Sequence, residues 1–531
     1  MMQHCVHKHD SKPQKHNCSC GGFSKTSTTG ISRRNFLGGL AAVSAISGLK
    51  LAATAQAGDI SKKSASSGAL PLGKTLRVKP VLTYTIERRQ EKTSWRGYGG
   101  IQTQAIAKEE AGIIKTELKN LTSQAEFSIE VLPVSLVDND QKADAVAGED
   151  YDVLLLYAAG GNQVYKLAAT KKPTIMFVRH KSGYHYLWYE IAHWRFLRRN
   201  GDIIKETNMD VDDIVVDDYA EILWRLRALY GLKNAKGTKM LAIGGLVAYS
   251  ESGQKLGPKN AKELWNYDFI IVSEQEFAKL LAKARVDENV MKQAQRKTEE
   301  LLAQPNVTLR TDRRFVVNSF LALNVCKRLM KESGAENFGF ANCMGKSVIE
   351  MLDTPPCLVL SLANDEGYTA YCHTDLTHTL PGVLLRWIAG KPTFVCNSHF
   401  PHNGIFTVAH CAAPRKMNGR DYEPTTIMTH FESDYGAATK VRYTKGQVVT
   451  VIIPNLRCTK WQGFRGKVLD SPSNPACRSQ IDIKVEGDFS KLLDEMQGFH
   501  VQICYGDYLR EVGYALNKIG TVEWQNFSEN V

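Results

Sequence analysis

The hydrophobic positions of this chain change their pattern along the sequence. Between residues 150 and 372, short apolar runs alternate with segments in which apolar residues recur every three or four positions. Short continuous apolar runs separated by helical patterns are typical of parallel strands covered on both faces. We expect such strands at 151–157, 174–180, 239–245, 268–273, 337–343 and 356–362, with helices at 274–284, 287–303 and 315–332.

Beyond residue 400 the pattern becomes one of strands and hairpins. The β-branched and apolar runs there lie at 407–413, 425–432, 439–444, 448–454, 467–469 and 480–486, and a last strand from His500 leads into a helix that ends at Gly520. Strands spaced by short turns predict an antiparallel sandwich or barrel. The predicted fold class is therefore α/β, with two doubly wound, Rossmann-like N-terminal domains and a β-rich, barrel-like C-terminal domain.

The first residues have the pattern of an export signal rather than of a folded domain. The sequence Ser32-Arg33-Arg34-Asn35-Phe36-Leu37 precedes a mildly apolar run at 36–49 and an A-x-A site at 55–57. We interpret residues 1–57 as a twin-arginine signal peptide, which predicts a periplasmic or otherwise extracytoplasmic protein. The apolar run is shorter than the ~20 residues that span a bilayer, so no stable membrane insertion is expected after cleavage.

With 531 residues the chain is too long for a single core at roughly 150 residues per domain. We expect a flexible linker at 58–74, an N-terminal α/β domain at 75–170, a second α/β domain at 171–400 that carries the functional site, and a β-rich domain at 401–531. The linker is rich in Ser, Gly and Lys and has almost no apolar periodicity.

Charge and cysteine content exclude some classes of function. The formal net charge is +12, but half of it belongs to the signal, and no basic stripe with interleaved aromatic residues follows, so no nucleic-acid partner is expected. The glycine pairs Gly160-Gly161 and Gly244-Gly245 match neither G-x-G-x-x-G nor the P-loop, so no nucleotide cofactor is expected. Nine cysteines follow residue 320 without any C-x-x-C pair, and we interpret them as buried thiols.

One stretch, CHTDLTHTLPGVLLRWIAGKPTFVCNSHF at 372–400, holds many polar side chains around an apolar helical pattern. The pattern predicts a strand at 367–372, a helix at 380–389 and a second strand at 393–396. If the two strands are parallel, His373 and Asn397 leave the same edge of one sheet. Open α/β sheets bind their ligands at that edge.

This stretch and three later segments resemble the L-fucose isomerase and L-arabinose isomerase-like family. The later segments are TVAHCAAP at 407–414, THFESDYG at 429–436 and FHVQICYGDY at 499–508, and the resemblance is clearest from about residue 356 to 522. It implies a divalent metal, Mn in the family, that is held by a Glu, an Asp and a His. It also implies a homo-oligomer, trimeric or hexameric.

The family's metal ligands carry over unevenly. His500 stands at the position of the metal histidine, but His373 replaces the Glu and Asn397 replaces the Asp, and in the family these carboxylates also lie near the carbon whose proton moves. Imidazoles shift metal preference from Mn or Mg toward Zn, Co or Ni. Asp375 could restore part of the negative charge. Three alternatives remain: a His-rich metal site, a metal-free site with acid–base histidines, or a positive pocket for an anionic sugar.

The catalytic residues expected from this comparison are His373, Asp375 and Asn397, and the metal ligands are His373, Asn397 and His500. Further residues follow predicted strands or alternate along one, and these are expected to bind substrate: Arg179, His180, Lys181, His399, His430 and Glu432. His378 is interpreted as a structural residue of the helix.

The resemblance implies a carbohydrate-active protein of the aldose-ketose isomerase type. It would act on a sugar or sugar derivative through an enediolate-like intermediate. The alternative is a non-catalytic or carbohydrate-binding relative that has lost the metal carboxylates.

Overall fold

The computed structural model describes residues 73–190 and 209–529. The predicted signal peptide and nearly all of the predicted linker lie outside these residues. The described part confirms the α/β class: it contains parallel sheets and, toward the C-terminus, a closed antiparallel barrel. Within the described residues, no helix is both long and apolar enough to cross a bilayer.

The first sheet is parallel throughout and has the order β2-β1-β4-β5-β6, with β3 also paired to β1. Its strands are β1 (Leu76–Thr83), β2 (Ile129–Val131), β3 (Ser135–Val137), β4 (Val153–Ala158), β5 (Thr174–Val178) and β6 (Ile214–Val216). The helices α1 (Gln104–Gln124), α2 (Asp140–Ala147) and α3 (Gln163–Ala168) contact it, and α4 (Leu187–Glu190) is a single turn. Because β5 and β6 belong to this sheet, the domain boundary expected at residue 170 falls inside it.

The second sheet has the order β11-β10-β7-β8 and is also parallel. Its strands are β7 (Lys239–Ile243), β8 (Asp268–Val272), β10 (Asn337–Phe340) and β11 (Thr369–Cys372). The helices in this part of the chain are α5 (Tyr219–Ala235), α6 (Glu251–Trp265), α7 (Glu274–Val286), α8 (Glu288–Leu302), α9 (Arg313–Ser333) and α10 (Lys346–Leu352). The helices predicted at 274–284, 287–303 and 315–332 are confirmed as α7, α8 and α9.

The strand predicted at 356–362 is wrong, because this segment forms α11 (Cys357–Asp365). Every residue of α11 is buried, so its sequence shows an apolar run without a polar face. A short, fully buried helix and a buried strand have the same hydrophobic pattern. Pro356 at the N-cap was the available signal, since proline is well tolerated at a helix start.

Six antiparallel strands close into the C-terminal barrel: β12 (Phe394–Ser398), β13 (Ile405–His410), β18 (Ser479–Glu486), β17 (Lys460–Asp470), β16 (Val448–Pro454) and β19 (His500–Tyr505). The strand β20 (Glu523–Asn526) pairs in parallel with β17, and α13 (Phe489–Glu495) and α14 (Leu509–Ile519) complete this region. A small separate sheet joins β9 (Val307–Arg310), β14 (Thr425–Met428) and β15 (Ala438–Val441).

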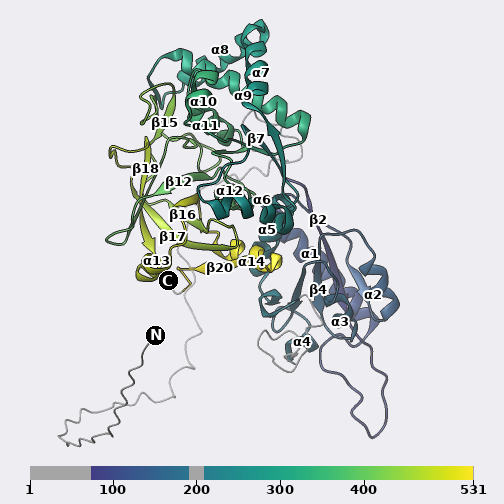
Figure 1. Cartoon of the computed structure of the whole chain (residues 1–531). Coiled ribbons are helices and arrows are strands. Elements are labelled where there is room, and N and C mark those ends of the chain that lie inside the picture. The colour runs from purple at the N-terminus through teal and green to yellow at the C-terminus, as the bar shows by residue number, and fades with distance from the viewer. Residues whose placement is uncertain (1–72, 191–208, 530–531) are drawn as a thin grey trace, which may run out of the picture. The chain divides into compact units, whose positions relative to one another are not determined.

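Helix α12 (Leu376–Ala389) links the second sheet to the barrel. It contacts β11 in the sheet and β12, β16 and β19 in the barrel (Figure 1). The condition under which His373 and Asn397 would leave the same sheet edge is not met: β11 and β12 belong to different sheets, because α12 leads the chain from one to the other. The barrel consequently begins before residue 400, and the polar residues around α12 lie where the two structures meet.

Candidate functional site

Asp375 is the N-cap of α12 and provides the first atom of a buried polar group. Its Oδ1 accepts the backbone N–H of Thr377 at 2.9 Å, which satisfies one of the free donors at the helix start. Its side chain is only 1% exposed, and Oδ2 has no hydrogen-bond partner. One carboxylate oxygen thus caps the start of the helix, and the other is available to bind a ligand.

His378 lies three residues further on, on the same face of the first turn. Its Nε2 is 2.9 Å from the carbonyl oxygen of Cys372, so Nε2 carries the proton and donates it. The remaining nitrogen, Nδ1, then has a free lone pair, and it is buried without a partner. Burial lowers the pKa of His378 to about 3, so the ring is neutral at ordinary pH.

His500 is the first residue of β19 and faces the start of α12 from the barrel. It pairs with Asn397 of the neighbouring antiparallel strand β12. Gln502, two residues further along β19 and on the same face, donates a hydrogen bond to the carbonyl oxygen of His378 at 2.8 Å. His500 Nδ1 lies 3.9 Å from Asp375 Oδ2, and its ring meets that of His378 edge-on at 5.0 Å. Burial lowers the pKa of His500 well below its usual value.

These three side chains are a possible metal-binding group. One ligand-type atom from each of Asp375, His378 and His500 lies within 4.8 Å of the other two, and all three residues are buried. Buried polar atoms nearly always have hydrogen-bond partners, so three neighbouring side chains that each have a buried atom without a partner need an explanation. A carboxylate and two neutral imidazoles are a common donor set for a divalent transition metal. The residues present fit such an ion, and their charge offsets half of its +2.

The structure brings together part of the ligand set that the sequence suggested. His500 belongs to the group, and Asn397 is its cross-strand neighbour with an unpartnered Oδ1. Asp375, expected as a catalytic residue that partly replaces a lost carboxylate, is the carboxylate of the group. His378, interpreted as structural, is its third member.

His373 lies beside this group rather than within it. Its Nε2 is 2.7 Å from the hydroxyl of Tyr249, whose ring also contacts His500 edge-on at 4.5 Å. Cys343 and Cys372 lie next to His373, and a hydrogen bond from the Cys372 thiol lowers the pKa of Cys343. Tyr249 is 50% exposed, so the site meets solvent through this residue.

A surface pocket of about 380 Å³ adjoins the strand ends that carry Asn397 and His500. His399 lines it, as the sequence suggested for a substrate-binding residue, together with Phe499. The Phe499 ring contacts the rings of both Tyr249 and His500. An aromatic surface therefore separates this pocket from the buried polar group.

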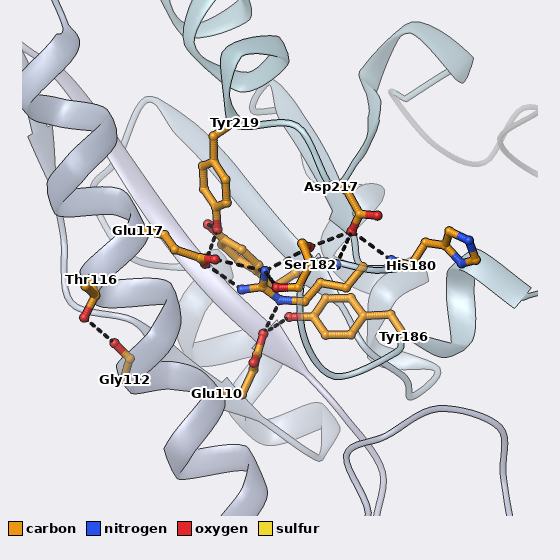
Figure 2. A network of polar contacts seen from close by, with 11 residues as sticks. Glu110, Gly112, Thr116, Glu117, His180, Ser182, Tyr186, Asp217 and Tyr219 are labelled. Carbon is orange, nitrogen blue, oxygen red and sulfur yellow. Dashed lines mark hydrogen bonds and ion pairs between the residues drawn. The ribbon is translucent and has the colours of Figure 1, made fainter. Parts of the chain in front are cut away.

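Arg179, expected to bind substrate, lies instead in a buried ionic network of the first sheet. Its side chain is fully buried, Nε bonds Glu110 at 2.6 Å, and Nη2 bonds Glu117 at 2.6 Å. Tyr186 and Tyr219 donate to the same two carboxylates (Figure 2). These contacts satisfy the guanidinium, and we leave Arg179 out of the proposed site.

The neighbours of Arg179 are more accessible. Asp217 accepts the backbone N–H groups of His180 and Lys181, which shapes the loop after β5 (Figure 2). The His180 ring stacks on Tyr189 at 4.1 Å, and Lys181 is exposed. The segment that follows, 191–208, lies outside the described residues.

His430 and Glu432 lie in the loop after β14 rather than along a strand. His430 is buried, its Nδ1 contacts Ser433, and its Nε2 is 3.8 Å from a carboxylate oxygen of the exposed Glu432.

The nine cysteines of the described part form no disulfide, and only Cys477 is not fully buried, as the sequence led us to expect.

No family model and no curated protein matches the chain. Among solved structures it is similar to PH0766 from Pyrococcus horikoshii OT3, with 14% identity over 60% of this chain and 66% of that protein, slightly less than two thirds of its length. The TM-score of 0.17 is too low to support an argument about fold or function.

Proposed function

We propose that this protein is a metal-dependent enzyme that transforms a sugar or sugar derivative by moving protons between neighbouring carbons, as an aldose-ketose isomerase does. The observation that carries the proposal is the group of unpartnered atoms Asp375 Oδ2, His378 Nδ1 and His500 Nδ1. The resemblance of residues 356–522 to the fucose and arabinose isomerase family supplies the substrate class and the fucose isomerase type of fold.

The proposed metal ligands are Asp375, His378 and His500. When bound, a divalent ion such as Zn, Co, Ni or Mn supplies Lewis-acid polarisation of a substrate oxygen. The helix cap fixes Asp375, and the Cys372 carbonyl fixes the tautomer of His378, so both ligands are positioned before any ion binds. Asn397 lies beside them, and its Oδ1 can accept a hydrogen bond from a substrate hydroxyl.

Tyr249 lies at the solvent edge of the site, where its hydroxyl can donate a hydrogen bond to a substrate oxygen. Burial of the ring raises the pKa of this hydroxyl, so it keeps its proton and acts as a donor rather than as a base. His373 orients this hydroxyl at 2.7 Å through Nε2. His399 and Phe499 line the adjoining pocket, where an aromatic face can stack on a sugar ring. An oligomer of the kind that the resemblance implies is also part of the proposal.

The test combines metal content with proton exchange. We expect a stoichiometric transition metal in the purified protein, its loss in His378→Ala and His500→Ala, and its retention in His402→Ala, a control histidine on an exposed loop. Incubation in D2O with neutral, uronic and sulfated sugars should place deuterium on the carbon next to the carbonyl of at least one of them, and Tyr249→Phe should slow this exchange.

Two results would count against the enzyme. A protein that binds sugars without deuterium incorporation would be the carbohydrate-binding relative instead. Metal content that is unchanged in both His378→Ala and His500→Ala would remove the proposed metal ligands.

A further inference from the structure

A second group of potential ligands lies beside the first. It consists of Cys343, Cys372 and His373, with one ligand atom from each within 4.8 Å of the others. The parallel strands β10 and β11 bring it together: Phe340, which ends β10, is paired with Cys372, which ends β11. Cys343 lies three residues beyond the first strand, and His373 directly follows the second.

The backbone holds His373 in an unusual conformation. Its φ is 61°, in the left-handed region that residues other than glycine rarely adopt. Its carbonyl oxygen also packs so closely on Gly339 that a Cβ there would lie 2.5 Å away. Strained backbone of this kind tends to occur at functional sites. Here it places the imidazole against the Cys343 sulfur, which is 3.8 Å from Nε2 and 4.0 Å from Nδ1.

The two ring nitrogens of His373 differ in their partners. Nε2 is 2.7 Å from the Tyr249 hydroxyl, whereas Nδ1 has only longer contacts, at 3.4 Å to the carbonyl oxygen of Ala341 and 4.0 Å to the Cys343 sulfur. Histidines that bind metals typically use one nitrogen for the ion and donate the other N–H to a fixed partner. When Nε2 donates its proton to the Tyr249 hydroxyl, Nδ1 is the nitrogen that can bind an ion.

We propose that Cys343, Cys372 and His373 form a second metal site, selective for a thiophilic ion such as Zn²⁺. Two thiolates and one imidazole are soft donors that oxygen-preferring ions such as Mg²⁺ and Mn²⁺ do not favour. Two thiolates offset the ion's charge completely, and three protein ligands leave a fourth coordination position open. This site is separate from the Asp375, His378 and His500 group, and it does not depend on the proposed function.

Tyr249 lies between the two groups. It bonds His373 on one side and contacts the His500 ring on the other. A molecule bound at the exposed edge of Tyr249 would therefore be adjacent to both groups. The buried Cys343 and Cys372 thiols, which the proposed sugar chemistry does not use, then serve as metal ligands.

Cobalt distinguishes the two sites, because only sulfur ligands give thiolate-to-cobalt charge-transfer absorption. We expect this absorption when Co²⁺ is added to the reduced, metal-free full chain. It should be lost in Cys343→Ala and Cys372→Ala and retained in Cys326→Ala, whose buried thiol belongs to neither group. It should also be retained in His500→Ala, which removes a ligand of the first group only.

A measurement on the wild-type chain covers the case in which these variants do not fold. Because Cys343 and Cys372 are buried, they are alkylated only during local opening; Zn²⁺ should slow their alkylation in peptide mass mapping but leave the labelling of the half-buried Cys477 unchanged. Absence of the charge-transfer band in the wild type, or a band that survives in both Cys343→Ala and Cys372→Ala, would overturn the proposal. Metal bound only by the Asp375, His378 and His500 group would overturn it while leaving the proposed function intact.

Discussion

Nδ1 of His500 and Oδ2 of Asp375 face each other across 3.9 Å, and neither atom has a hydrogen-bond partner among the described residues. One comes from the first residue of a barrel strand and the other from the cap of a helix that leaves the parallel sheet. Their approach brings together two parts of the chain that are 125 positions apart in the printed sequence.

Replacing Asp375 separates its two roles. Asp375→Asn keeps an oxygen that can cap α12 but removes the negative charge, so we expect weaker metal binding with little loss of stability. Asp375→Ala removes the cap as well and should lower the free energy of unfolding of the metal-free protein by a further ~1 kcal/mol. Urea denaturation and metal titration of both variants check this. Equal stability of the two would show that the cap contributes little.

Metal should stabilise the folded chain through the first group. An ion that binds only the native state at 100 times its Kd adds ~2.7 kcal/mol to the free energy of unfolding. We expect Zn²⁺ or Co²⁺ to raise Tm, a chelator to reverse the effect, and His378→Ala to reduce it. Melting curves of His402→Ala, the exposed control, should respond to the ion as the wild type does.

Removing Arg179 should destabilise the first sheet strongly. Arg179→Met leaves the fully buried Glu110 carboxylate without its cation (Figure 2), and breaking a buried pair in this way costs ~3–5 kcal/mol. Lys255→Met, which removes an exposed pair with Glu251, should change stability by less than ~0.5 kcal/mol. Adding Glu110→Gln to Arg179→Met should recover part of the loss. Comparable effects of the buried and exposed substitutions would contradict this account.

Gly339 should not tolerate a side chain. The Cβ of Gly339→Ala would lie 2.5 Å from the His373 carbonyl oxygen, so we expect a loss of ~1–3 kcal/mol in the free energy of unfolding and displacement of His373. Gly112→Ala is the matched control, because nothing lies within 4 Å of a Cβ there and the residue is in α1. That control should be neutral or slightly stabilised. Denaturation curves of the two variants decide the matter.

His410 should contribute to acid sensitivity. Burial lowers its pKa to about 4, and its Nδ1 accepts the N–H of Ala412 at 3.1 Å. As pH falls, the unfolded chain takes up the proton at about 6.5, before the folded chain does. Stability is thus complete above about pH 6.5 and is lost as pH falls toward about 4. His410→Asn, which keeps an acceptor but does not titrate, should show a shallower decline. If the free energy of unfolding fell equally steeply with pH in the variant and the wild type, His410 would be excluded as a source of the acid sensitivity.

Much of the fold could be predicted from the hydrophobic pattern, since buried parallel strands and amphipathic helices such as α8 have distinct periods. The pattern could not separate the buried helix α11 from a strand. It also could not show that α12 passes from one sheet to another, because that depends on contacts distant in sequence.

The candidate site was predictable in part. The resemblance to the isomerase family pointed to His500 and its neighbour Asn397. The role of His378 was missed, although Asp375 and His378 have the three-residue spacing that places two side chains on one helix face. Cys343 gave no sequence signal, because only the pairing of β10 with β11 brings it to His373.

The carboxylate that caps α12 is also a member of the buried ligand group. Fraying of the first turn would therefore carry Asp375 and His378 away from His500, so the opening of the helix and the opening of the site are the same motion. Backbone amides of residues 377–379 should then exchange with solvent more slowly when an ion occupies the group, because the Thr377 N–H donates to Asp375 and His378 belongs to the same turn.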